Sequence, residues 1–193
     1  YGGYGGIGYY HVSDTYIALF SHFIPCGVYE AIYILDGLIR NQSDIKPDIL
    51  HGDTQAQSTP VFALAHLLGI QLMPRIRNIK DLVFFKPGRD ARYQNIQSLF
   101  TGSSIDWDLI ARHYDDMLRV AVSIKAGMIT PSMLLRRLGS ASRKNKLYFA
   151  FRELGRVIRT QFLLRYISDP ELRRTIHAET NKTEEFHQFA GWA

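Results

Sequence analysis

Cysteine is nearly absent, since Cys26 is the only one, and this excludes an intramolecular disulfide framework and any cysteine-based zinc site. No apolar run approaches the roughly 18 residues that a membrane-spanning helix needs, and no signal peptide opens the chain. A Walker loop, a Gly-x-Ser-x-Gly elbow and a His-Glu-x-x-His zinc motif are also missing. We therefore expect a soluble protein without a membrane partner, and none of the enzyme classes that these motifs define.

Positive charge is concentrated in one segment. Residues 1–100 carry equal numbers of basic and acidic side chains, so the formal net charge of +5 lies in the second half of the chain. Between positions 136 and 165 the basic residues face a single acid, Glu153; they are Arg136, Arg137, Arg143, Lys144, Lys146, Arg152, Arg156, Arg159 and Arg165. Such a cluster indicates a polyanionic partner, most simply nucleic acid. From charge alone, a solvated helix face explains it equally well.

The first third of the sequence alternates between strand and helix patterns. With 193 residues and 46% apolar content, the chain can form one sizeable core. Periodicity and turn residues predict, in order, a hairpin of strands 6–12 and 15–23, a helix at 28–40, a strand at 48–53, a helix from Ser58 to Gly69 and a strand at 71–76. Pro74 predicts that this last strand lies at an edge or ends early. The expected class is α/β.

Beyond about residue 90 the strand pattern stops and helices are predicted at 105–124, 132–138, 144–167 and 170–177. In the third of these, an apolar stripe runs beside a face that carries Arg152, Arg156 and Arg159. An amphipathic helix of this kind could lie against a phosphate backbone.

Two carboxylates are candidates for chemistry. Asp53 follows a predicted strand in the run His51-Gly52-Asp53-Thr54-Gln55, and ligands bind at that end of strands in open α/β sheets. Glu184 lies in the run Thr180-Asn181-Lys182-Thr183-Glu184, near the start of the last predicted helix. Both could reach one divalent metal ion, although a loop or capping role for Asp53 is the more frequent outcome of such spacing.

Several runs resemble one family, in one order along the whole chain. They are residues 1–6 (YGGYGG), 11–21 (HVSDTYIALFS), 51–55 (HGDTQ), 72–78 (LMPRIRN), 151–156 (FRELGR) and 180–184 (TNKTE). Together they are similar to the TnpA-type transposases of replicative class II transposons, the Tn-three family.

That resemblance implies a ribonuclease-H-like mixed sheet and a triad of two Asp and one Glu that binds Mg²⁺ or Mn²⁺. Asp53 matches the second Asp and Glu184 the Glu, whereas the first Asp belongs to a central strand that has no counterpart here. Asp14 lies in the predicted hairpin turn, and we assign it a structural role. Ala56 and His187 stand where the family usually has Gly and Asn.

The implied organisation has three parts: a strand and helix core at 1–88, a helical insertion at 89–178 and a catalytic helix at 179–193. The implied partners are transposon ends and target DNA, with a homodimer in the full-length enzyme, working in the bacterial cytoplasm at the nucleoid. We expect the DNA backbone to contact Arg143, Lys144, Arg152, Arg156, Arg159 and Lys182.

Without the first Asp, we expect the chain alone neither to nick nor to join DNA. A non-catalytic, basic DNA-binding remnant of a decayed transposase is the alternative. An unrelated α/β metal-dependent nuclease is a third possibility.

Overall fold

The protein begins with an antiparallel hairpin. The structure is a computed structural model, and it describes residues 6–25, 33–40, 47–52, 54–140 and 145–192. Strands β1 (Gly6–Val12) and β2 (Ala18–Pro25) pair antiparallel, which confirms the predicted hairpin. In the turn, Ser13 N donates to Ile17 O at 2.8 Å, and Tyr16 has a left-handed backbone with φ of 63°. Asp14 lies in this turn, as expected.

A parallel strand pair follows. This β-α-β unit consists of strand β3 (Ile49–Gly52), the 3-10 turn η2 (Thr54–Gln57), helix α2 (Thr59–Leu68) and strand β4 (Gln71–Pro74). Strand β3 pairs parallel with β4. Ser58 occupies the N-cap position, although its side chain makes no capping hydrogen bond. Gly69 ends α2 in a left-handed conformation with φ of 83°, which glycine adopts without steric cost. Strand β4 ends at Pro74, as predicted.

The prediction that strands stop near residue 90 is wrong. Strand β5 (Phe84–Lys86) pairs parallel with β6 (Phe100–Ser104), and the short 3-10 turns η3 (Ile79–Asp81) and η4 (Gln97–Leu99) precede them. The β6 residues Phe-Thr-Gly-Ser-Ser show no alternation of apolar and polar side chains, so the sequence carries little strand signal. Tertiary contact supplies it instead, because the Phe84 and Phe100 rings pack 5.4 Å apart.

The helical part contains α3 (Trp107–Lys125), α4 (Pro131–Ser140), α5 (Lys146–Ser168) and α6 (Pro170–Trp192), close to the predicted ranges. The exception is α6, which continues without interruption through residues 178 and 179. Glu184 therefore lies in the second half of one long helix and not near the start of a separate one. Of the predicted helix at 28–40, the structure describes α1 (Asp36–Arg40), and residues 26–32 lie outside the described ranges.

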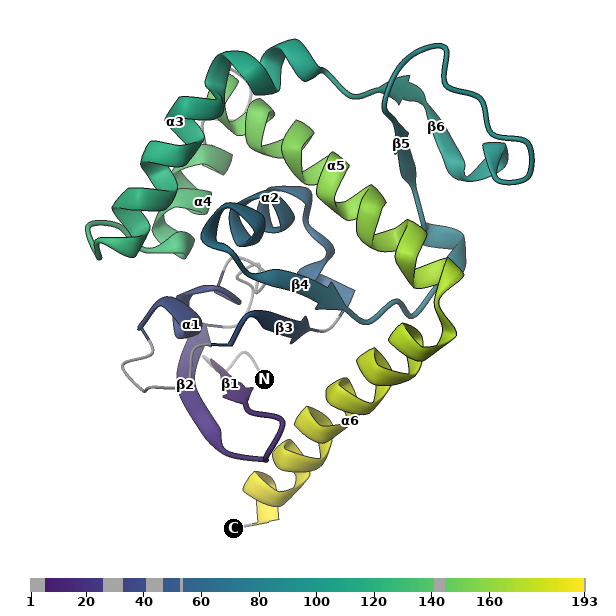
Figure 1. Cartoon of the computed structure of the whole chain (residues 1–193). Helices are drawn as coiled ribbons and strands as arrows, with labels where there is room; N and C mark the ends of the chain where they lie inside the picture. Colours follow the sequence, from purple (N-terminus) through teal and green to yellow (C-terminus); the bar gives the residue numbers. More distant parts are fainter. Residues whose placement is uncertain (1–5, 26–32, 41–46, 53, 141–144, 193) are drawn as a thin grey trace, which may run out of the picture.

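Helix α5 crosses the centre of the molecule (Figure 1) and packs along α2. The two backbones meet at Gly155, where a Cβ atom would lie only 1.7 Å from the Thr59 carbonyl oxygen. Phe151 on the same helix is fully buried. One cluster of buried apolar side chains draws on α2, β4, α3, α4 and α5 together, so the predicted core and the predicted insertion share a single hydrophobic core.

A buried carboxylate fixes α4. Asp36 in α1 is 4% exposed, and its Oδ1 accepts a hydrogen bond of 2.8 Å from the backbone N of Ser132 in the first turn of α4. Its other oxygen accepts from the Ser132 hydroxyl. Unpaired N–H groups at a helix start favour a carboxylate there.

The fold class is mixed α/β, as predicted. The described strands form three separate pairs, β1–β2, β3–β4 and β5–β6, and no ladder joins one pair to another within those ranges. Helix α6 contacts both β1 and β3, which brings the first two pairs to the same helix (Figure 1). None of the described helices is both long enough and apolar enough to cross a membrane.

Candidate catalytic edge

The carboxyl ends of β3 and β4 form the edge where Asp53 was expected to act. Gly52 ends β3, and its carbonyl accepts a hydrogen bond of 2.8 Å from the backbone N of Arg75, the residue after β4. A Cβ on Gly52 would lie 2.8 Å from Ile34 Cδ1 and 2.9 Å from Ala56 Cβ, so a larger residue here would force these neighbours to move. Asp53 itself lies outside the described residues, and its predicted role stays a prediction.

Glu184 is held at this same edge. Its Oε1 lies 3.2 Å from Nη1 of Arg75, and the Arg75 and Glu184 side chains are 24% and 56% exposed. Through Arg75, the second half of α6 is therefore tied to the residue whose backbone binds Gly52. Two positions far apart in the sequence, Glu184 and the residue immediately before Asp53, both contact Arg75.

A hydrogen-bonded chain supports the turn after Asp53. Gln57 Nε2 donates to the Arg75 carbonyl at 3.4 Å, and Gln57 Oε1 accepts from Arg159 Nη2 at 3.3 Å. Arg159 Nη1 also donates to Val83 O at 3.2 Å. Burial lowers the pKa of the Arg159 guanidinium from its usual value. These contacts connect α5, in the centre of the molecule, to the η2 turn.

Sequence reasoning did not single out Arg75 or Gln57. Arg75 lies within the run at 72–78 that supports the family resemblance, but an arginine after a strand has no distinctive spacing. Its role depends on a partner 109 positions away.

The hairpin packs on α6 beside Glu184. The Tyr16 hydroxyl donates to Glu185 Oε2 at 2.9 Å, and the Tyr10 and Phe186 rings lie 5.7 Å apart. The hydrogen bond to Glu185 raises the pKa of Tyr16 above its usual value. The left-handed turn that exposes Tyr16 thus places its hydroxyl on the helix that carries Glu184.

Lys182, one of the expected DNA contacts, lies in this interface. Its Nζ donates to Glu179 Oε1 at 2.8 Å and to the carbonyl of Asp14 at 3.2 Å. The hydrogen bond to Glu179 raises the pKa of Lys182. In this arrangement, Lys182 joins α6 to the hairpin turn.

Three of the four arginines of α5 have partners within the protein, and the fourth, Arg165, is exposed. Arg156 pairs with Glu153, and its guanidinium lies 4.7 Å from the centre of the Phe85 ring. The Arg152 guanidinium lies 5.5 Å from the Phe149 ring. Arg152, Arg156 and Arg159 are all partly buried. Arg152 lies over Phe149, Arg156 lies over Phe85 of β5, and Arg159 bonds to Gln57 in the η2 turn. Arg143 and Lys144 lie outside the described residues.

The donor chemistry of this edge suits a hard divalent cation, because Glu184 supplies carboxylate oxygens that are open to solvent. Among the residues that the structure describes, no three His, Cys, Asp or Glu side chains are grouped as a metal site. Asp53 is not among those residues. The positive charge beside Glu184 is at present that of Arg75.

Comparison with known proteins assigns the family. The family model for the Tn3 transposase DDE domain matches residues 1–193. The chain belongs to this family. It is 40% identical over 176 residues to the transposase for transposon Tn21 of Escherichia coli, and 40% identical over 180 residues to that for Tn501 of Pseudomonas aeruginosa. It is 36% identical over 188 residues to the transposase for transposon Tn1546 of Enterococcus faecium.

These matches cover 91%, 93% and 97% of the chain but only 18%, 18% and 19% of the relatives. The chain therefore spans less than a fifth of the length of each of these transposases.

Proposed function

We propose that this chain is part of the catalytic domain of a DNA transposase, in which Asp53 and Glu184 bind Mg²⁺ or Mn²⁺. The observation that carries the proposal is that Arg75 contacts both Glu184 and the carbonyl of Gly52. Gly52 ends β3 and immediately precedes Asp53 in the sequence. The assignment of the chain to the Tn3 transposase DDE domain family supports it.

The proposed fold is ribonuclease-H-like, with a further central strand between β1 and β3. Both strands contact α6, and no ladder joins them in the described ranges, so each has an edge that another strand could pair. We place the first catalytic Asp on that strand, outside this sequence. The proposed parts are a core at 1–88, an insertion at 89–178 and a catalytic helix at 179–193, although the last boundary falls inside α6.

The proposed reaction nicks the transposon ends and joins the freed 3′ hydroxyl to target DNA. Two divalent cations, when bound, stabilise negative charge on the attacking and leaving oxygens of such displacements. Glu184 supplies carboxylate oxygens for them, and Arg75 holds this side chain at the edge. The contacts among Gln57, Arg75 and Arg159 fix the η2 turn, so that the loop after Asp53 keeps one position.

DNA is the proposed partner, with backbone contacts from Arg143, Lys144, Arg152, Arg156, Arg159 and Lys182, and with a homodimer in the full-length enzyme. Arg156, Arg159 and Lys182 also contact other parts of the protein, so they contribute to its packing as well. The proposed setting is the nucleoid of a bacterial cell, since the substrate is DNA and the relatives are from bacteria.

The test replaces the matching segment of the Tn501 transposase by this chain and measures nicking of a labelled transposon end. We expect Asp53→Asn and Glu184→Gln each to lower nicking at least a thousandfold, because a carboxylate ligand is lost. Asp116→Asn, a change of a half-exposed carboxylate on α3, is the control and should leave nicking within about twofold. The isolated chain should not nick DNA. Nicking that survives Asp53→Asn or Glu184→Gln contradicts the proposal.

A further inference from the structure

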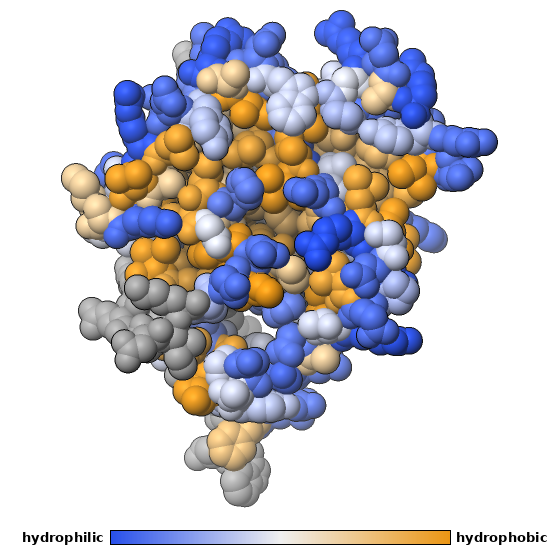
Figure 2. Space-filling model, in the orientation of Figure 1, coloured by the Kyte–Doolittle hydropathy of each residue, from blue (hydrophilic) through white to orange (hydrophobic). Residues whose placement is uncertain are grey.

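The balance of charge changes along α6. Up to residue 178, Arg173 and Arg174 outnumber Glu171, whereas from residue 179 on, three glutamates outnumber Lys182. The strip of surface over α6 is largely hydrophilic, in contrast to the apolar middle of the same face (Figure 2). A polar surface of this kind is unusual for packing against another protein core but suits a hydrated, charged ligand.

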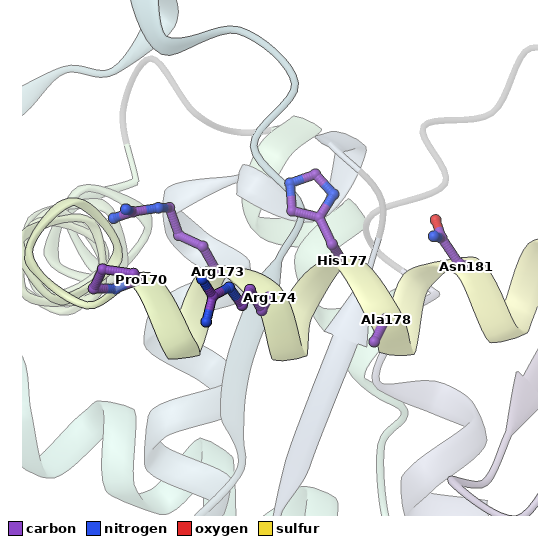
Figure 3. Close-up of a pocket in the computed structure, with 6 residues that line it drawn as sticks. All are labelled: Pro170, Arg173, Arg174, His177, Ala178 and Asn181. Carbon is purple, nitrogen blue, oxygen red and sulfur yellow. The ribbon is translucent and has the colours of Figure 1, made fainter.

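The first half of α6 borders a shallow hollow that is widely open to solvent, and all its lining residues belong to this helix: Pro170, Arg173, Arg174, His177, Ala178 and Asn181. His177 and Asn181 project from the same side of the helix (Figure 3). Arginine, histidine and asparagine side chains can all donate hydrogen bonds to phosphate oxygens, and the carboxylate in contact with this group is that of Glu171, which pairs with Arg174. The small side chain of Ala178 leaves room between the larger ones.

The hollow lies on the same helix face as Glu184. Residues 174, 177, 181 and 184 follow each other at three or four positions, so they share one face of α6. At 1.5 Å per residue, Arg174 and Glu184 are about 15 Å apart along the helix. That length equals the rise of about four nucleotides of one DNA strand at 3.4 Å each.

The existing partners of the two arginines leave them able to bind a further group. Arg173 Nη1 donates to the carbonyls of Tyr166 and Ile167 at 2.8 and 2.9 Å, which anchors it over the end of α5. Arg174 pairs with Glu171, and both side chains are at least 75% exposed. An ion pair this exposed contributes little, and a guanidinium has five donors, so a phosphate can join or replace Glu171.

We infer that Arg174, His177 and Asn181 form a binding site for the DNA backbone that holds phosphates next to the scissile one and leads the strand to Glu184. This inference rests on the proposed function, and it assigns the substrate strand to the outer face of α6. Binding here positions the strand and reads no bases.

The test measures binding of a fluorescent 20-base-pair duplex to the 193-residue chain by anisotropy, across a series of salt concentrations. Arg174→Ala should weaken binding about tenfold at low salt, the loss expected for one charge-assisted hydrogen bond. The slope of log K against log salt should fall by about 0.9, the value for one phosphate contact. His177→Ala and Asn181→Ala should weaken binding with smaller changes in slope.

Arg119→Ala is a matched control, since Arg119 on α3 is 79% exposed and pairs with Asp116 three positions before it, as Arg174 does with Glu171. Helix α3 lies at the upper left beside the beginning of α5, whereas α6 starts from the opposite end of α5 (Figure 1). The control should leave the slope unchanged. Equal effects of Arg174→Ala and Arg119→Ala overturn the inference and leave the proposed function intact. Conversely, nicking that survives Asp53→Asn in the chimera removes the proposed function without changing the salt slopes. Circular dichroism of each variant establishes that it is folded.

Discussion

Helices α5 and α6 are both 23 residues long, yet they differ in how much of their surface is buried. Nine residues of α5 are buried, on nearly every side of the helix, whereas Ile176 and Thr180 are the buried ones of α6 where its side chains are described. Helix α5 is held by apolar contact and by a close backbone approach. Helix α6 reaches the candidate catalytic edge through single polar contacts to Arg75 and to the hairpin, together with the packing of Phe186 on Tyr10. Stability therefore depends mainly on α5, while most of the described side chains of α6 are exposed or only partly buried.

The largest loss of stability should follow Gly155→Ala. The added Cβ would lie 1.7 Å from the Thr59 carbonyl oxygen, so α5 and α2 must move apart. We expect the free energy of unfolding to fall by about 3 kcal/mol or more, at the upper end of overpacking effects. Urea unfolding followed by circular dichroism measures it. Gly139→Ala in α4 is the control, because its Cβ would meet nothing within 4 Å, and it should stabilise the protein by up to about 1 kcal/mol. A stable Gly155→Ala variant would contradict the close packing of α5 on α2.

The next largest loss should come from Glu153→Ala. Glu153 is 8% exposed, pairs with Arg156 and accepts a hydrogen bond of 3.2 Å from the backbone N of Asp106. Its removal leaves two partly buried donors without their acceptor, at a cost of about 1–3 kcal/mol. Glu171→Ala removes the equivalent exposed pair with Arg174 and should cost less than about 0.5 kcal/mol. Equal losses in the two variants would show that burial does not separate α5 from α6.

Local patterns predicted much of this fold, because they depend on neighbouring residues. The hairpin, β3, α2 and the helix ranges follow from alternation, helical periodicity and residues such as Gly69. Long-range contacts explain what was missed. Strand β6 depends on the packing of Phe100 against Phe84, and the inward direction of Arg156 depends on Phe85. Glycine has a low helix propensity, so the sequence gives no reason for Gly155 in the middle of α5. The close approach of the Thr59 carbonyl oxygen explains it.

The candidate site was predictable only in part. The motifs indicated Glu184 and Asp53, and the structure places Glu184 beside Arg75 at the end of β3. That contact joins two segments 109 positions apart, which no spacing rule can connect. The sequence predicted two helices where the structure has one, so it did not place Arg174, His177 and Glu184 on one helix face.

A smaller loss should appear when the protein is acidified. His11 is 7% exposed, and its Nε2 lies 2.8 Å from the Ile34 carbonyl. Burial lowers the pKa of His11, against opposing effects of that hydrogen bond and of Asp36. The unfolded chain, with a histidine pKa of about 6.5, then binds a proton more readily than the folded protein, so stability falls as pH drops below that value. Unfolding free energies at pH 7.5 and 5 measure the loss. His11→Gln should reduce this pH dependence, and the exposed His66→Gln should not.

The smallest change should follow Tyr16→Phe, which removes the hydroxyl that joins the hairpin to Glu185 on α6. Because that hydrogen bond raises the pKa of Tyr16, its contribution is complete below the unfolded pKa of about 10 and is lost as pH rises through the higher folded pKa. The difference in unfolding free energy between wild type and variant should therefore be present at pH 8 and shrink by pH 11. Tyr114→Phe on α3, at a similar exposure of 42%, is the control. If the Tyr16 difference instead grows with pH, the hydroxyl does not donate to Glu185, and α6 is held at the hairpin by Lys182 and Phe186 alone.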